Sequence, residues 1–237
     1  MSPAFIQIKE LRKSFQMGRN TVHALAGIDL EIEQGSFTVI MGPSGSGKST
    51  LLYLLGGLDR PSSGKIQVKD QSIEALDENE LAVFRRKTVG FIFQSFNLIS
   101  SMTALQNVIF PMRFARLPFR QRSARAAELL KRVGLEDRQH HRPTELSGGQ
   151  QQRVAVARSL VNDPVLIMAD EPTGNLDTAS GSSIMQLLAD FHRNGRTVVV
   201  VSHDPRMSAF ATREIFLLDG KIVSKEQYLS ASMLISG

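Results

Sequence analysis

The chain has 237 residues, of which 42% are hydrophobic, so it can bury a sizeable core without help from disulfides or structural metals. It contains no cysteine, which excludes disulfide bonds, thiolate metal sites and a cysteine nucleophile. The formal net charge of +5 favours an anionic partner such as a nucleotide, a nucleic acid or a membrane surface.

The N-terminal stretch "MSPAFIQIKELRKSF" carries charges where a secretory signal would need an apolar segment. The longest apolar runs, "VLIMA" and "TVVVV", are strand-sized and far below the length of about 18 residues that suggests a membrane span. We therefore expect a soluble protein.

Apolar runs of strand length recur along the chain and alternate with helical patterns. Residues 5–15 and 28–42 alternate or run apolar, and residues 63–73 add a short strand and a turn. Further buried-strand patterns lie at residues 88–93, 165–170 and 196–204. This alternation predicts an α/β fold with a mostly parallel sheet. Near the C-terminus, Asp219-Gly220 between two apolar runs predicts a hairpin.

The segment from Gly42 to Ser49, "GPSGSGKS", matches the phosphate-binding pattern G-x-x-x-x-G-K-[ST]. The strand-like "FTVIM" precedes it and a helical run follows it, as that pattern requires. Its glycines allow backbone N–H groups to curl around phosphate oxygens, and the helix N-terminus adds positive dipole. We expect Lys48 to reach the β- and γ-phosphates and Ser49 to ligate Mg²⁺.

The middle of the chain, from about Asn97 to Leu160, shows little strand pattern. Residues 121–135 place apolar side chains at helical spacing, and Gly134 marks the end of that helix. We therefore expect a helical lobe inserted into the α/β core. One stretch of this lobe holds seven basic residues against a single acid, Glu128. It is either a solvated helix face or a contact for an anionic surface; the basic residues are Arg113, Arg116, Arg120, Arg122, Arg125, Lys131 and Arg132.

A second glycine turn follows in "LSGGQQQRVAVAR". Ser147 can cap a helix, and Gly148 and Gly149 leave backbone N–H groups open to a ligand. Val154, Ala157 and Val161 should then bury one face of that helix. This is a second anion site at a helix N-terminus, and its simplest use is a head-to-tail pair of chains in which it meets the partner's nucleotide.

The strand-like "VLIMADEP" ends in two acids, which is unusual for packing because charge at a strand end needs a partner. Asp170 is placed to hold the Mg²⁺ shell. Glu171, one residue further, could orient and deprotonate an attacking water.

Together these motifs resemble the ATP-binding cassette (ABC) ATPases over essentially the whole chain. Gly42–Thr50 is similar to the Walker A motif, Val165–Asp170 to Walker B, and Leu146–Gln150 to the family signature. Residues 174–177, "GNLD", are similar to the D-loop, and "VVSHD" to the switch-histidine segment. "GGLDRPSSG", "FIFQSFNLI" and "TALQNV" resemble the macrolide-exporter and lipoprotein-releasing branch (MacB/LolD type).

The resemblance implies a set of site residues. Catalysis would involve Glu171, His203 at the γ-phosphate, Gln94 and Lys48; Mg²⁺ would be held by Ser49, Gln94 and Asp170. ATP would contact Gly42, Pro43, Ser44, Gly45, Ser46, Gly47, Lys48, Ser49, Thr50, Gln94, Asp170 and His203, with Phe15 in place of the common tyrosine as the adenine-stacking ring. From the partner chain, Ser147, Gly148, Gly149, Gln150 and Asp177 would reach the same nucleotide.

The resemblance also implies the organisation of the chain. Residues 1–237 would form one nucleotide-binding domain, an α/β core with an antiparallel β subdomain (1–94 and 161–225) carrying a helical signature lobe (95–160). Residues 226–237 would be a tail that matches no motif. The adjacent His140 and His141 have no neighbouring ligand pattern, so we expect no metal site there.

The expected function is that of an ATP-hydrolysing subunit that dimerises around two MgATP and powers a separate permease, from the cytoplasmic face of the membrane. A permease of exporter or lipoprotein-release type fits the branch. The same ATPase could instead drive mechanical signalling across the membrane. A soluble, nucleic-acid-associated ABC ATPase is disfavoured, because such relatives carry tandem cassettes or long coiled coils; no nucleic acid is expected as a partner.

Overall fold

The structure, a computed structural model, describes residues 4–114 and 117–235. The chain divides into two compact units, the first made of Met1–Ala82 and Val199–Gly237 and the second of Val83–Val198. Helix α2 (Glu78–Thr88) and strand β8 (Thr197–Ser202) run across the two boundaries. Each unit has its own packed elements.

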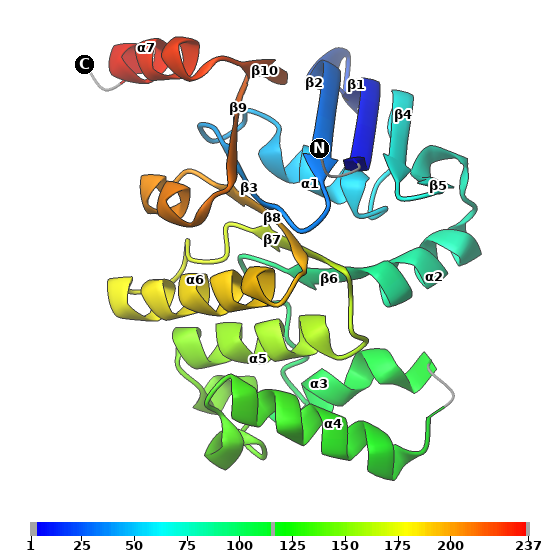
Figure 1. Ribbon diagram of the computed structural model, residues 1–237, viewed down its shortest axis with the longest axis vertical. Coiled ribbons are helices and arrows are strands. Elements are labelled where there is room, and N and C mark those ends of the chain that lie inside the picture. The colour runs from blue at the N-terminus through cyan, green and yellow to red at the C-terminus, as the bar shows by residue number, and fades with distance from the viewer. Residues whose placement is uncertain (1–3, 115–116, 236–237) are drawn as a thin grey trace. The chain divides into compact units, whose positions relative to one another are not determined.

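The first unit contains an antiparallel sheet with the strand order β2-β1-β4-β5, and the labels in Figure 1 follow this order. Its strands are β1 (Ala4–Met17), β2 (Asn20–Glu33), β4 (Ser63–Val68) and β5 (Gln71–Ser72). Ile8 faces Leu30 on one side and Ile66 on the other, and all three side chains are buried. The strands and the antiparallel subdomain expected from the sequence are confirmed.

The same unit holds the strand that leads to the first glycine turn and the strand that pairs with it. Strand β3 (Phe37–Met41) is buried along its whole length and runs parallel to β9 (Arg213–Leu218). A two-residue turn joins β9 to β10 (Lys221–Val223), and both of its residues are left-handed, Asp219 at φ 48° and Gly220 at φ 71°. The predicted Asp-Gly hairpin is therefore confirmed.

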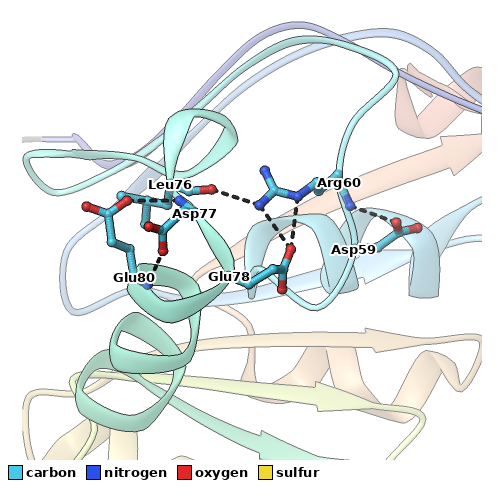
Figure 2. A network of polar contacts seen from close by, with 6 residues as sticks. All are labelled: Asp59, Arg60, Leu76, Asp77, Glu78 and Glu80. Carbon is cyan, nitrogen blue, oxygen red and sulfur yellow. Dashed lines mark hydrogen bonds and ion pairs between the residues drawn. The ribbon is translucent and has the colours of Figure 1, made fainter.

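Helix α1 (Lys48–Leu55) follows the glycine turn, and a polar network secures the chain after it. Figure 2 shows Arg60 between the Leu76 carbonyl oxygen and the Glu78 carboxylate, with contacts of 2.9 and 3.0 Å. Asp77 and Glu80 close the start of α2 by reciprocal side chain to backbone hydrogen bonds. The network joins the end of the α1 segment to the 3₁₀ turn η1 (Ile73–Ala75) and the first turn of α2.

The C-terminal part of this unit contains a 3₁₀ segment, two strands and a helix. After the 3₁₀ segment η5 (Pro205–Phe210), the chain forms β9 and β10 and ends in α7 (Lys225–Ile235). Tyr228 of α7 packs on Phe216 of β9, with ring centroids 5.0 Å apart. Helix α7 covers the described part of the tail that matched no motif, and it contacts β9 through this aromatic pair and through an ion pair between Lys225 and Glu214 at 2.9 Å.

The second unit contains two paired parallel strands, β6 (Val89–Ile92) and β7 (Leu166–Asp170). Along the chain, a series of helices separates the two strands. The helices α3, α4 and α5 lie against one another in this unit (Figure 1), and α6 follows β7. The elements are α3 (Ala104–Ile109), η2 (Phe110–Phe114), α4 (Phe119–Arg132), η3 (Glu136–Arg138), η4 (Pro143–Glu145), α5 (Gly148–Leu160) and α6 (Thr178–Arg193).

Two of these helices test the periodicity seen in the sequence. Helix α4 buries Ala126, Leu129 and Leu130, and Gly134 ends it at φ 73°, as predicted. Helix α5 buries Val154 and Ala157 as predicted, but also Ala155 and Val156. It is covered on several sides because α3, α4, α6 and β6 all pack on it. None of the helices in the described part of the chain is long and apolar enough to cross a membrane.

Candidate active site

The first glycine turn lies between β3 and α1, where its backbone leaves room for no larger residue at two positions. A Cβ on Gly42 would lie 2.4 Å from the Leu217 carbonyl oxygen, and one on Gly47 would lie 2.4 Å from the Ala24 carbonyl oxygen. Gly47 is also left-handed, at φ 99°, and immediately precedes α1. The glycines are therefore required by close approach and by backbone conformation.

The side chains of this turn are arranged for an anion. Lys48 is only 6% exposed, and its ammonium group donates to the carbonyl oxygens of Gly42 and Pro43, both at 2.9 Å. Ser46 is 2% exposed, and its hydroxyl has no hydrogen-bond partner among the described residues. A buried cation and an unsatisfied buried hydroxyl at a helix N-terminus fit a bound phosphate group, which would supply acceptors to both.

Phe15 lies in the same unit, on β1, opposite Val22 of β2. Its ring is 39% exposed, and the Lys13 ammonium lies 4.9 Å from the ring centroid. Lys13 in turn donates to Asp59 and to the Arg60 carbonyl oxygen, both at 2.7 Å. The ring is therefore held beside the polar network that follows α1, with part of its surface open to a planar ligand.

His203 follows directly on the buried end of β8 and is exposed. The next residue, Asp204, caps η5 by accepting from the Arg206 backbone N–H. Hydrogen bonding from the Arg206 guanidinium, with a smaller effect from the charge of His203, lowers the pKa of the Asp204 carboxyl. His203 therefore lies at the start of a turn that the hydrogen bond between Asp204 and Arg206 stabilises.

In the second unit, Gln94 follows β6 and begins a turn in which Phe96 and Asn97 are both left-handed, at φ 59° and 49°. Asn175, from the loop after β7, donates to the Gln94 carbonyl oxygen at 3.1 Å. A Cβ on Gly174 would lie 2.8 Å from the Gln94 amide nitrogen. The D-loop is therefore seated directly against Gln94.

The second glycine turn begins α5 as the sequence predicts. Ser147 caps the helix by accepting from the Gln150 backbone N–H at 3.3 Å, and the Gln150 side chain accepts from the Ser147 backbone at 3.0 Å. A Cβ on Gly148 would contact Leu176 at 3.6 Å and the Phe96 ring at 3.8 Å. A Cβ on Gly149 would clash with the Ser180 hydroxyl at 2.6 Å. The signature turn therefore packs against both the turn that begins at Gln94 (residues 94–97, here called the Q-loop) and the D-loop.

The two acids after the buried strand differ in environment. Asp170 ends β7 and is 6% exposed, whereas Glu171 is left-handed, at φ 44°, in the turn that follows. The side-chain amide of Gln152, from α5, donates to the Pro172 carbonyl oxygen at 2.8 Å and holds this turn. A non-glycine residue in this conformation is costly, and such strain is often found at functional sites.

Asp177 closes the D-loop as the cap of α6. Its carboxylate accepts from the Ser180 backbone N–H at 2.9 Å, and that hydrogen bond is the main reason that the pKa of Asp177 is lowered. This cap was not predicted, although an aspartate directly before a run with helical periodicity is an ordinary start signal.

The predicted site residues fall into two groups, one in each unit. The first unit carries the whole glycine turn, Phe15 and His203; the second carries the Q-loop, both acids, the signature turn and the D-loop. Sequence reasoning did not find the side chains that hold the second group together, which are Gln152, Arg158 and Asn175. For Arg158 a signal exists, because a charged residue within a buried helix needs a polar partner.

The oxygen ligands available suit magnesium better than a transition metal. Among the described residues, no three His, Cys, Asp or Glu side chains come close enough to hold a metal ion. Mg²⁺ needs only one or two carboxylates beside phosphate oxygens and water, so the Asp170 carboxylate and the Gln94 amide oxygen of the second unit are ligands of the kind that it takes, as is the Ser49 hydroxyl of the first unit. His141 is instead engaged with Arg138, whose guanidinium lies 3.2 Å from its ring nitrogen.

Comparison with known proteins gives a consistent result. The family model described as "ABC transporter" matches residues 25–174. An uncharacterised ABC transporter ATP-binding protein of Thermotoga maritima is 48% identical over 222 residues, which cover 94% of this chain and 95% of the relative. The macrolide export ATP-binding/permease protein MacB of Hyphomonas neptunium is 49% identical over 94% of this chain, but the chain spans only 35% of that relative.

Solved structures agree with these sequences. A dimeric ATP-binding cassette, MJ0796, in a post-hydrolysis state bound to ADP and Pi, superposes with a TM-score of 0.87 at 45% identity. The alignment covers 92% of this chain and 97% of that one. A second structure, cbiO1 of Clostridium perfringens, described as part of the transporter complex cbiONQ, has a TM-score of 0.82 at 30% identity over 98% of this chain and 94% of its own.

Proposed function

The chain belongs to the ABC transporter family and is an ATPase, and on that premise we propose that it is the nucleotide-binding subunit that powers a separate membrane permease. The observation that carries the proposal is the first glycine turn. At the start of α1, this turn places the buried ammonium of Lys48 beside the buried Ser46 hydroxyl, which has no hydrogen-bond partner among the described residues. A bound phosphate would supply that hydroxyl with an acceptor.

Each group of residues has a part in this proposal. The backbone of Gly42–Thr50 and the Lys48 ammonium bind the ATP phosphates, Phe15 stacks on the adenine, and His203 contacts the γ-phosphate. Ser49, Gln94 and Asp170 supply oxygen ligands, and the bound magnesium would offset the phosphate charge. Glu171 accepts the proton of the attacking water, and its strained backbone supports an assignment to the chemistry.

We propose further that two copies close head to tail around two ATP molecules. The signature residues Ser147–Gln150 and Asp177 of one copy would then face the phosphates held by the other, at the positively polarised N-termini of α5 and α6. The dimeric state of the similar cassette MJ0796 supports this arrangement. C₂ symmetry makes two equal sites.

The permease contact is proposed at a groove of about 790 Å³ in the second unit. Phe114 and Leu117 expose apolar surface there, beside Arg86, Lys87 and Arg125. Arg86 donates to the Phe114 carbonyl oxygen at 2.9 Å, which fixes one wall. The lining holds three cations against one acid, Asp163, and this excess of positive charge beside apolar surface suits an amphipathic segment that carries acidic residues. Through this contact the subunit would sit on the cytoplasmic face of the membrane, with a permease of exporter or lipoprotein-release type.

The decisive experiment compares the wild type with Glu171→Gln. We expect the variant to keep ATP binding, to lose about 10²–10⁴-fold in ATP turnover, and to elute as a dimer with ATP in size-exclusion chromatography. Glu136→Gln is the matched control, because Glu136 is an exposed residue paired with Lys131 in the helical segment. Near-normal turnover by Glu171→Gln would remove Glu171 from the catalytic role.

A further inference from the structure

Helix α5 carries a half-buried cation, Arg158, whose hydrogen-bond partners are carbonyl oxygens rather than carboxylates. One guanidinium nitrogen of Arg158 donates to the Phe96 carbonyl oxygen at 2.8 Å, and the other donates to the Asn97 carbonyl oxygen. Burial lowers the pKa of this guanidinium, although an arginine stays charged in any protein environment. Both charge-assisted hydrogen bonds therefore end on the backbone of the Q-loop.

The backbone that Arg158 contacts is unusual. Phe96 and Asn97 are consecutive residues with φ 59° and 49°, a left-handed conformation that is uncommon for non-glycine residues and costs more for phenylalanine than for asparagine. The loop's own hydrogen bonds are short-range, from Phe96 N–H to the Phe93 carbonyl and from Asn97 N–H to the Ser95 carbonyl. A guanidinium holds two successive carbonyl oxygens in one fixed planar geometry, whereas a lysine ammonium can donate to two oxygens, as Lys48 does, without fixing their relative orientation.

The turn begins at Gln94, and Gln94 is held from its other side. Asn175 donates to the Gln94 carbonyl oxygen, and the backbone at Gly174 lies against the Gln94 amide. The direction of the Gln94 side chain is therefore set between a D-loop contact before the turn and the Arg158 contact after it. Because Arg158 is on the same helix as Ser147, it also ties the Q-loop to the signature helix.

We propose that Arg158 is a positioning residue, which holds Phe96–Asn97 in the left-handed turn and so sets the direction in which Gln94 points. The proposal rests on the proposed function, in which Gln94 is a ligand in the nucleotide site. Arg158 itself touches neither nucleotide nor metal; its effect on turnover passes through the Q-loop backbone.

The test uses Arg158→Met and Arg158→Lys, alone and combined with Asn97→Gly, in the full chain. Glycine adopts the left-handed conformation without help, so Asn97→Gly should compensate for the lost guanidinium. Arg153→Met is the matched control, because Arg153 lies on the same helix and donates instead to the Ser183 hydroxyl at 2.9 Å. The readouts are kcat and KM for ATP, amide hydrogen exchange of residues 94–99, and thermal unfolding.

We expect Arg158→Met to lower kcat about tenfold or more while KM stays within about threefold, since a misplaced group costs turnover rather than binding. Amide exchange should accelerate in residues 94–99 and stay unchanged in the rest of α5. Asn97→Gly should restore kcat to within about threefold of the wild type and slow the exchange again. Arg158→Lys should be intermediate, and it remains informative if the methionine variant does not fold.

Two results would overturn the proposal. One is that Arg158→Met has the same kcat and the same amide exchange in residues 94–99 as an active wild type. The other is a loss that Asn97→Gly does not restore and that is accompanied by faster exchange throughout α5, which is the signature of a fold-stabilising residue. An inactive wild type would instead count against the proposed function, and the exchange data would still decide whether Arg158 holds the loop.

Discussion

Both glycine turns of this chain precede helices, but they are built differently. In the first, Gly42–Lys48, glycines occupy the positions where a Cβ would clash. Its lysine donates hydrogen bonds to carbonyl oxygens of the same turn. The second begins α5 at Ser147, and its neighbourhood is made of three loops that hold one another. There the left-handed positions are occupied by Phe96, Asn97 and Glu171 rather than by glycine.

This difference shows two ways in which a chain can maintain an unfavourable backbone. A glycine removes the cost locally and leaves the turn independent of distant residues. A non-glycine residue keeps its side chain for function, and the cost must be offset by contacts such as those of Gln152 and Arg158. The first turn is therefore sensitive to changes within itself, whereas the second is sensitive to changes on α5 and in the D-loop.

The largest expected effect comes from separating the two turns onto different chains. Lys48→Ala disables the first turn and Ser147→Arg the second, so each variant alone should be nearly inactive. If sites form between copies, an equimolar mixture gives half heterodimers with one intact site each, and about a quarter of wild-type activity should return. The measurement is ATPase activity against mixing ratio.

The control for this mixing experiment is the physical state of each protein. Circular dichroism should show that both variants are folded, since Ser147 also caps α5. Heterodimers should be demonstrated with two affinity tags. Absence of any recovery at all ratios, with heterodimers present, would contradict a site shared between copies.

A smaller effect should separate steric from conformational demands within the first turn. Gly45→Ala places a Cβ at φ 80° with no described atom within 4 Å, so it should cost only the strain, about 1–2 kcal/mol of unfolding free energy. Gly47→Ala adds a clash with the Ala24 carbonyl oxygen at 2.4 Å, and we expect a cost above about 3 kcal/mol. Urea unfolding of both variants measures the difference. Equal costs would show that the loop relaxes and that close approach does not matter here.

The same contrast explains how much could be predicted from the sequence. The first turn, the strands beside it and the Asp219-Gly220 hairpin depend on residues a few positions apart, and all of them were predicted. The signature turn was predicted as a capped helix start for the same reason. The contacts around it were not, because Arg158 reaches Phe96 across 62 residues and Asn175 reaches Gln94 across 81. The burial of Ala155 and Val156 in α5 was also missed, since it depends on the four elements that pack on this helix.

The basic stretch of the helical segment remains a prediction of the sequence, and the structure gives it a setting. Arg120 and Arg122 lie on the first turn of α4, and Arg122 lies over the Phe119 ring at 5.8 Å. Phe119 is 65% exposed, so an aromatic ring and cations share one surface near the groove assigned to the permease. Arg116, the third arginine of the prediction, lies outside the described residues.

Arg120→Gln with Arg122→Gln should therefore have the smallest effect on catalysis. We expect the ATPase rate of the isolated subunit to stay within about twofold of the wild type, because neither residue belongs to the turns that carry the proposed chemistry. Association with permease-containing membranes should weaken about tenfold at low salt, since each basic residue near an anionic surface contributes on the order of 1 kcal/mol. The difference should shrink as salt rises and screens the charges. Cosedimentation at two ionic strengths measures both effects.

Lys131→Gln with Arg132→Gln provides the matched control, because it removes the same charge from the other end of α4, where Lys131 already pairs with Glu136. If the stretch were only a solvated helix face, neither pair of substitutions would change membrane association. If net charge alone mattered, both pairs would weaken it equally. Only a surface localised at the start of α4, beside Phe119, predicts loss from the first pair and none from the second. A large fall in basal ATPase in the well-folded Arg120/Arg122 variant would tie these arginines to the chemistry instead and refute the assignment.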